Sequence, residues 1–301
     1  MGFQTALGEA EMHEDVEDSR RRVSRRRLLG GGATVGLSAL LAACAPTVFG
    51  SGGRSPEASA PGSEATPTPL PTASDGAVIA PSTESTSDLI ARLDAVGSCR
   101  LTSQETQGPY WFDVDSIRSD IREDRPGAPL DLVLRVYDRS CRPLPNSVVE
   151  IWHCDAGGIY SGYEVASTGG ERSSETDLSD GAYSAGDREN VPADDGTYLR
   201  GAQVADANGI VQFRTIWPGW YTGRTVHIHL KVHIDRQNVL TSQLYFDDEL
   251  NDRVHVAEPY ASHSGRDTRN DSDGIYDPTG LLTTESSTDG HLAYTNLGVD
   301  L

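Results

Sequence analysis

The chain has 301 residues, of which 37% are hydrophobic and 23% are charged, enough for one good-sized globular domain with extensions. Its 45 Asp and Glu residues outnumber 25 Lys and Arg residues and give a net charge of −20. Because phosphate binding needs clustered cations, this balance argues against nucleic acid or an anionic membrane surface as a partner.

Residues 1–44 have the features of an export signal. The run Arg25-Arg26-Arg27 precedes a glycine-rich turn and an apolar stretch that is too short to span a bilayer and ends at Leu41-Ala42-Ala43-Cys44. This order resembles a twin-arginine signal with a bacterial lipobox. It predicts an exported lipoprotein, at the cell surface or in the periplasm, that touches the membrane only through a lipid on Cys44. The alternative is a buried helix with an ordinary cysteine.

Residues 45–92 are mostly Ser, Thr, Pro, Ala and Gly, with hardly a bulky side chain. Such a segment cannot bury enough apolar area to offset the entropy of ordering it. We therefore predict a disordered linker that holds a domain away from a membrane. The folded domain is predicted to comprise residues 93–301.

Three cysteines follow Cys44 along the chain: Cys99, Cys141 and Cys154. A disulfide is permitted outside the cytoplasm, and an odd number of cysteines leaves one thiol free. Cys141 lies in a predicted hairpin turn and Cys99 just before the first ordered segment. We predict a Cys99–Cys141 disulfide, and pairings with Cys154 stay open.

The domain contains several alternating runs rich in β-branched residues, each the length of a strand. They cover residues 129–138, 146–155, 209–217, 225–234 and 239–246. No long stretch shows a convincing helical period. The predicted fold class is all-β, an antiparallel β-sandwich of two sheets with long active-site loops. A segment rich in Gly, Ser and Asp, residues 164–197, is predicted to be a solvated loop, without the ligand spacing of a calcium site.

The run 225–234 carries an unusual pair of histidines. A strand sends residues i and i+2 to one face, so His227 and His229 point together while Ile228 points away. His233 shares their face but lies roughly 10 Å from His229 along the strand, beyond reach of the same metal ion. His153 is predicted to be an ordinary strand residue. His13 lies before the arginine run of the signal, and three further histidines are predicted to lie in polar loops: His255, His263 and His291.

Two tyrosines complete a candidate metal set. Tyr160 follows a Gly157-Gly158 turn, and Tyr221 lies six residues before His227. Two imidazoles suit zinc, copper, iron or nickel, whereas a phenol, with a pKa of about 10, needs a hard, highly charged cation to remove its proton. Fe(III) is the biological ion most given to tyrosinate binding, while zinc is expected with Cys, His or carboxylate ligands.

These residues lie in motifs that resemble the intradiol ring-cleavage dioxygenases, the family of protocatechuate 3,4-dioxygenase and catechol 1,2-dioxygenase. The resemblance covers roughly residues 99–260 and looks strongest to exported single-chain bacterial members. It rests on "TQGPY" (106–110), "VEIWHCDAGGIYSGY" (149–163), "FRTIWPGWY" (213–221), "RTVHIH" (224–229) and "TSQLYF" (241–246).

The resemblance implies a role for each matching residue. The ferric ligands would be Tyr160, Tyr221, His227 and His229, with Tyr163 a rival to Tyr160, and Tyr221 would leave the metal when substrate binds. Arg224 would stabilise negative charge on the substrate ring, a role that suits a permanently charged guanidinium. Gln243 would lie near the substrate oxygens, and Thr106, Gly108 and Pro109 would line the substrate pocket.

The implied activity is that of a non-haem Fe(3+) enzyme. It would use O2 to cleave a catechol-type ring between the two hydroxyl-bearing carbons and give a muconate-type diacid. Because the 164–197 segment lies beside the site, the resemblance is expected to hold for the iron ligands rather than for the substrate pocket. The alternative is a non-catalytic, cell-surface β-sandwich binding module of the transthyretin-like type, in which Tyr221 caps a sheet.

Overall fold

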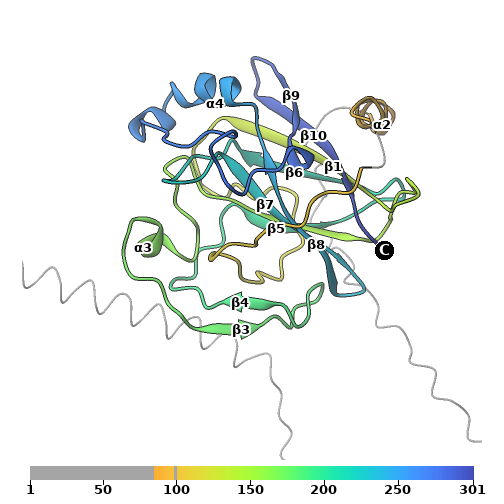
Figure 1. Ribbon diagram of the computed structural model, residues 1–301, viewed down its shortest axis with the longest axis horizontal. Coiled ribbons are helices and arrows are strands. Elements are labelled where there is room, and N and C mark those ends of the chain that lie inside the picture. The colour runs from red at the N-terminus through yellow and green to blue at the C-terminus, as the bar shows by residue number, and fades with distance from the viewer. Residues whose placement is uncertain (1–84, 98–99) are drawn as a thin grey trace, which may run out of the picture.

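The computed structural model describes residues 85–97 and 100–301. The predicted export signal with Cys44, most of the predicted linker and Cys99 lie outside them. The described residues form two four-stranded sheets that pack face to face (Figure 1). One has the strand order β6 (Ile210–Ile216), β1 (Pro129–Tyr137), β10 (His291–Gly298), β9 (Thr283–Ser286); the other has the order β5 (Arg200–Val204), β2 (Val148–Trp152), β7 (His227–Ile234), β8 (Gln237–Tyr245). The prediction of a β-sandwich is confirmed.

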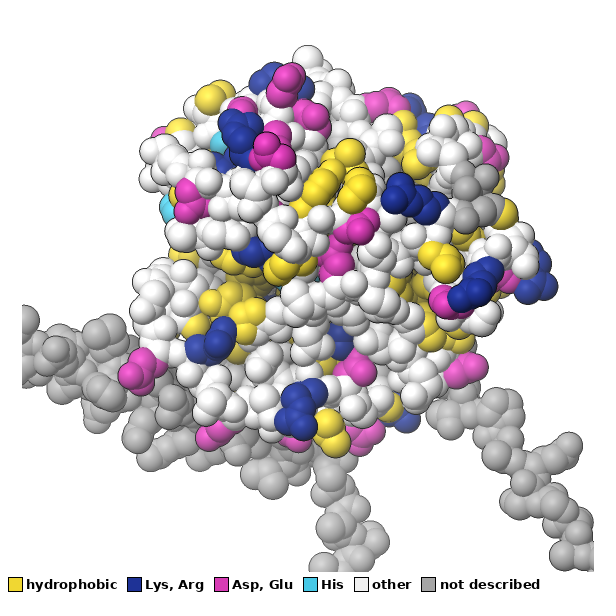
Figure 2. Space-filling view, viewed as in Figure 1, with side chains coloured by type: hydrophobic (Ala, Val, Ile, Leu, Met, Phe, Trp, Pro, Cys, Tyr) yellow, Lys and Arg dark blue, Asp and Glu magenta, His cyan; other side chains and the backbone are white. Residues whose placement is uncertain are grey.

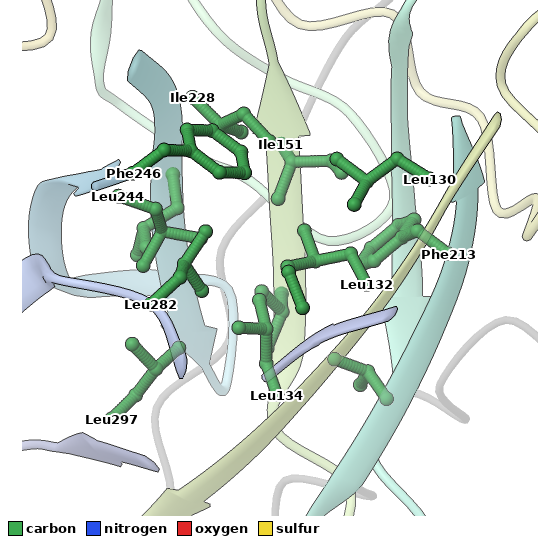
Figure 3. Packing of buried hydrophobic residues seen from close by; sticks show 14 of the residues in the cluster. Leu130, Leu132, Leu134, Ile151, Phe213, Ile228, Leu244, Phe246, Leu282 and Leu297 are labelled. Atoms are coloured by element: carbon green, nitrogen blue, oxygen red, sulfur yellow. The ribbon is translucent and has the colours of Figure 1, made fainter. Parts of the chain in front are cut away.

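The core lies between the two sheets and follows the alternation along each strand. Leu132 of β1 and Phe213 of β6 face Ile151 of β2 and Ile228 of β7 across the sandwich (Figure 3). All four side chains are fully buried. Burying apolar surface stabilises a fold by roughly 25 cal/mol per Å², so this layer fixes which face of each strand points inward.

One of the two sheets is mixed rather than antiparallel. β10 pairs in parallel with β1, with Leu130 opposite His291 and Tyr137 opposite Gly298. The prediction of two antiparallel sheets is therefore wrong for this pair. Antiparallel neighbours can be joined by a two-residue hairpin, which fixes their directions. β10 is joined through the turn at residues 287–290 to its antiparallel neighbour β9, whereas β1 lies far away in the chain, so no hairpin sets the direction of β10 relative to β1.

The folded region begins before the predicted boundary at residue 93. The helix α2 (Thr86–Ala95) is capped by Ser85, whose side chain accepts from the backbone N–H of Asp88. Leu89 and Leu93 lie on one face of the helix and are buried against the β1–β10 sheet. The polar residues around this short apolar face masked it in the sequence. The predicted linker boundary at residue 92 is therefore wrong, because residues 86–92 belong to α2.

The shorter elements occupy the connections between the strands. These are α3 (Glu164–Ser167), β3 (Thr176–Leu178), β4 (Arg188–Asn190), α4 (Asp248–His255), η1 (Tyr260–Ser262) and η2 (Pro278–Gly280). β3 and β4 pair with each other and lie beside the β5–β2–β7–β8 sheet (Figure 1). His255 is the last residue of α4 and His291 is the first residue of β10. The prediction that these two histidines lie in loops is therefore wrong.

Two further features are the distribution of charge on the surface and the length of the helices. Acidic and basic side chains are interspersed on the face shown in Figure 2, without a gathered basic patch on that face. None of the helices among the described residues has the length and apolar character needed to cross a membrane.

Candidate functional site

The two predicted histidines lie on the face of β7 that points away from the sandwich core. His227 and His229 are each 2% exposed, and their Nε2 atoms lie 3.1 Å apart. In the sheet, His229 is opposite Trp152 of β2 and Gln243 of β8. The Trp152 ring stacks on the His229 ring with a centroid separation of 5.0 Å and an interplanar angle of 4°. The predicted sharing of one face is confirmed, and the neighbouring strands hold the His229 ring in place.

The two predicted tyrosines reach the same point from different loops. Tyr160 Oη lies 3.5 Å and Tyr221 Oη 3.1 Å from Nε2 of His227. The glycine turn before Tyr160 makes this possible, because Gly158 has φ +84° and a Cβ there would lie 2.3 Å from the carbonyl oxygen of Trp220. Thus the backbone that precedes Tyr160 passes directly against the backbone that precedes Tyr221.

The polar surroundings fix the state of the histidines. Nδ1 of His227 lies 2.6 Å from the backbone oxygen of Thr225, and since a carbonyl only accepts, Nδ1 carries the proton and Nε2 presents a lone pair. Burial lowers the pKa of His227 to about 3, and burial together with the nearby His227 lowers the pKa of His229 well below its usual range. Both imidazoles are therefore neutral, which is the form that binds metal ions.

Both tyrosines are protonated when no cation is present. Burial raises the pKa of Tyr221 to about 12 and that of Tyr160 well above its usual range. The described residues hold no group of three or more His, Cys, Asp and Glu side chains arranged for a metal ion, so a metal here would depend on the phenols. Two neutral imidazoles and two phenols that need a strong positive charge to ionise fit a trivalent hard cation. Within the described part of the chain, buried Nδ1 of His229 has no hydrogen-bond partner, so ring packing positions this imidazole.

Arg224 lies at the edge of this cluster and is held at two atoms. Its Nε donates to Asp273 Oδ2 at 2.9 Å and its Nη2 donates to Gln243 Oε1 at 2.5 Å. Gln243 Nε2 in turn donates to the backbone oxygen of Thr106 at 3.0 Å. The structure thus joins Arg224, Gln243 and the 106–110 loop in one network. Sequence reasoning missed Asp273, because nothing distinguishes it from the other acidic residues of its loop.

The predicted substrate-lining loop covers the second histidine. A Cβ on Gly108 would lie 3.2 Å from Cε1 of His229, so the loop backbone passes directly over that ring. Gly108 has φ +68°, and its N–H donates to Thr106 Oγ1 at 3.1 Å. Tyr110, which sequence reasoning did not single out, lies with its ring centroid 4.9 Å from that of Tyr160. An aromatic ring directly after Pro109 was the available signal.

The residues that the sequence analysis did not favour as metal ligands have their polar atoms paired with other groups. His153 Nε2 pairs with Thr215 Oγ1 at 2.7 Å, and His233 Nε2 lies 3.3 Å from Glu150. The hydroxyl of Tyr163 donates to the backbone oxygen of Asn190, so Tyr160 and not Tyr163 faces His227.

The two cysteines of the described residues, Cys141 and Cys154, are not members of this cluster of donors. Cys141 is disulfide-bonded, whereas Cys154 is free and buried. This excludes Cys154 as the partner of Cys141. The predicted partner, Cys99, lies outside the described residues.

Comparisons with known proteins identify relatives of this chain. Residues 106–185 match the family model described as "Dioxygenase". The chain is 26% identical over 165 residues to chlorocatechol 1,2-dioxygenase of Rhodococcus opacus, covering 51% of this chain and 59% of the relative. It is 28% identical over 173 residues to catechol 1,2-dioxygenase of Acinetobacter baylyi, covering 50% and 48%. The chain therefore spans about half the length of the curated relatives it matches.

A solved structure gives a fuller match. The intradiol ring-cleavage dioxygenase of Tetranychus urticae is 30% identical with a TM-score of 0.58, and the alignment covers 67% of this chain and 95% of that one. With nearly all of a relative's domain matched in both sequence and fold, the chain belongs to the intradiol ring-cleavage dioxygenase family.

Proposed function

We propose that the protein is a non-haem Fe(III) intradiol dioxygenase. It would cleave a catechol-type ring with O2 between the two hydroxyl-bearing carbons and release a muconate-type diacid. The observation that carries this proposal is the convergence of Tyr160 Oη, Tyr221 Oη and His229 Nε2 to within 3.5 Å of His227 Nε2. The catechol 1,2-dioxygenase names of the curated relatives support the substrate class.

The four converging side chains, Tyr160, Tyr221, His227 and His229, would hold the iron. Bound Fe(III) would supply a Lewis acid that orients the substrate and lets a ring carbon react directly with O2. Tyr221 is the more exposed of the two tyrosines, and its Oη would accept a proton from a substrate hydroxyl as it moves aside. Tyr160, which is 1% exposed, would stay in place.

Arg224 would act on the substrate rather than on the metal. Its Nε and Nη2 are engaged by Asp273 and Gln243, and its Nη1 makes no hydrogen bond within residues 85–97 and 100–301. A permanent charge fixed at two atoms stabilises negative charge that develops on the ring without reorganising during the reaction. The backbone at Gly108 and the ring of Tyr110 would form the pocket wall over His229 and Tyr160.

We also propose that the protein acts outside the cytoplasm as a lipoprotein. The support is the order of arginines, apolar stretch and Cys44 at the N-terminus. Twin-arginine export carries folded proteins, so iron could be loaded before translocation.

The deciding experiment measures iron, colour and chemistry in one preparation. Protein from iron-replete cells should contain stoichiometric iron and be red to burgundy from tyrosinate-to-Fe(III) charge transfer. Adding a catechol should shift that band, consume O2 and yield a ring-opened diacid that mass spectrometry identifies. A colourless, iron-free protein from the same cells would support the non-catalytic binding module instead.

A further inference from the structure

The segment 164–197, hereafter the insertion, packs on the sheet face that carries the two histidines. Tyr183 is 1% exposed and packs with Val148 of β2 and Ala202 of β5. Its ring centroid lies 5.6 Å from that of His233. The backbone N–H of Ala185 donates to the backbone oxygen of Arg236, at the turn between β7 and β8. The expectation of a solvated loop is therefore wrong for the middle of the insertion.

An ion pair joins the insertion to β7. Lys231, the only lysine in the chain, lies two residues after His229 on the same face, and its side chain is 1% exposed. Its Nζ lies 2.5 Å from Oδ2 of Asp187 in the insertion. Its Nζ also lies 3.3 Å from the ring centroid of Trp111, a cation–π contact. A buried ammonium is costly without a partner, and Asp187 is the acidic residue that accepts a hydrogen bond from Lys231 Nζ.

The loop 106–113 lies between the insertion and the candidate metal site. On the insertion side, Gln107 Nε2 donates to the backbone oxygen of Arg188 at 2.8 Å, and the N–H of Asn190 donates to the backbone oxygen of Trp111 at 3.0 Å. The N–H of Asp113 donates to a carboxylate oxygen of Glu189 at 2.8 Å. Three consecutive residues of the insertion thus bind the loop.

On the site side, the same loop contacts the candidate ligands. Gly108 passes over the His229 ring, and the Tyr110 ring lies against Tyr160. The indole N–H of Trp111 donates to Glu150 of β2 at 3.1 Å, which seats the far end of the loop on the sheet. The loop therefore contacts the insertion on one side and the candidate ligands on the other.

We propose that the insertion holds the 106–113 loop against the candidate metal site, and that the Lys231–Asp187 ion pair fixes the insertion to the sheet. Lys231 and Asp187 are then positioning residues for the substrate pocket. They contact neither substrate nor metal. The effect on substrate rests on the proposed dioxygenase function, whereas the attachment of the insertion does not.

The single lysine allows the attachment to be measured without any activity assay. The full iron-loaded chain is treated with an amine-reactive acylating reagent, and peptide mass spectrometry gives the labelling rate at Lys231, apart from the N-terminal amine. Lys231 should be protected in the wild type. Asp187→Ala should raise its labelling rate at least about tenfold, because the local opening that exposes it becomes cheaper.

A matched control comes from the same insertion. Asp180 also joins the insertion to the β7–β8 turn, through Arg236 at 3.1 Å, but its side chain is 94% exposed. Because solvent-exposed ion pairs contribute little, Asp180→Ala removes an equivalent charge and should hardly loosen the attachment. Lys231 in the Asp180→Ala protein should be labelled at the same rate as Lys231 in the wild type. Equal protection of Lys231 in the Asp187→Ala and Asp180→Ala proteins would overturn the proposal.

Kinetics test the positioning role separately. Asp187→Ala and Lys231→Met should keep their iron and charge-transfer band, raise KM for a catechol about tenfold and change kcat by less than about threefold. Lys231→Arg should restore KM, since a guanidinium can also reach the carboxylate. Faster labelling with an unchanged KM would refute the positioning of the pocket. A wild-type protein without dioxygenase activity would refute only the proposed function, and the labelling result would stand. If Lys231→Met does not fold, the kinetic test uses Asp187→Ala, because that substitution leaves β7 unchanged.

Discussion

The carboxylate of Asp273 accepts two hydrogen bonds at one oxygen: from Nε of Arg224 and from the backbone N–H of Thr225, each at 2.9 Å. The Asp273 side chain is 1% exposed and that of Arg224 13%. The two residues lie 49 positions apart in the chain. Because the same oxygen binds the backbone of the segment that leads into β7, the guanidinium is fixed relative to His227 and cannot swing away from the site.

Replacing Arg224 should separate catalysis from metal binding. Arg224→Ala should keep its iron and still show a spectral shift when a catechol is added, because the metal binds the substrate oxygens. It should consume O2 at least about a hundredfold more slowly, as when one oxyanion-type donor is lost. Arg142→Ala, which removes an exposed surface arginine, is the control. Turnover near that of the wild type in Arg224→Ala would remove the assigned role.

Replacing Asp273 should act through Arg224. Asp273→Asn keeps an acceptor for Thr225 but loses the charge that orients the guanidinium, so turnover should fall roughly tenfold, the equivalent of one weakened charge-assisted hydrogen bond. The double variant should be no slower than Arg224→Ala alone, since both changes remove one function. Additive losses in O2 uptake would show that Asp273 acts independently.

The two histidines and Tyr221 should differ in what they contribute to iron binding. His227→Ala and His229→Ala should each hold less than about a tenth of the wild-type iron, because water replaces a buried imidazole poorly. Tyr221→Phe should keep part of the iron, shift the visible band and slow turnover. Iron analysis of His291→Ala, which removes a partly exposed histidine hydrogen-bonded to Ser286, gives the reference. Full iron and colour in His227→Ala would contradict the assignment.

Adding one methyl group over His229 should disturb the site more than the same change elsewhere. Gly108→Ala places a Cβ 3.2 Å from His229 Cε1, whereas Gly169→Ala meets nothing within 4 Å, and both residues have positive φ, +68° and +90°. Both variants should lose about 1–2 kcal/mol of stability from the backbone conformation. Only Gly108→Ala should also raise KM for a catechol. If the two variants have the same KM, the loop does not form the pocket wall.

Stability should fall as the pH rises from about 4 towards 7. Burial raises the pKa of Asp113 from 3.8 to about 7, and burial raises that of Glu105 from 4.5 to about 7. The folded state then holds protons that the unfolded state has lost, so the stabilisation is complete below about pH 4 and is lost towards pH 7. Urea unfolding should give a lower free energy of unfolding at pH 8 than at pH 5. Asp113→Asn should reduce that difference, and an unchanged difference would exclude Asp113 as a source.

The export proposal is tested in the native host. Changing Arg25 and Arg26 to Lys should leave folded protein in the cytoplasm, and Cys44→Ala should release the exported protein from the membrane fraction. Cell fractionation with an antibody measures both. Membrane association that survives Cys44→Ala would rule out lipid anchoring at this residue.

The sequence alone was sufficient for features that depend on neighbours in the chain. Alternation along 225–234 placed His227 and His229 on one face, because a strand's side chains alternate whatever the strand pairs with. The runs that became β1, β2, β6, β7 and β8 were visible for the same reason. The chemistry of phenols and imidazoles then pointed to a hard cation before any geometry was known.

Features that depend on contacts between distant segments were decided only by the tertiary structure. β10 pairs in parallel with β1, a strand far from it in the chain, so no hairpin sets their relative direction. Asp273 reaches Arg224 from a loop with several equivalent acids. Asp187 and Lys231 lie in segments whose compositions predict a solvated loop and an ordinary strand. These three contacts depend on which surfaces of the folded chain are buried against each other. Burial between distant segments produces no periodic pattern in the sequence, so the sequence alone could not predict them.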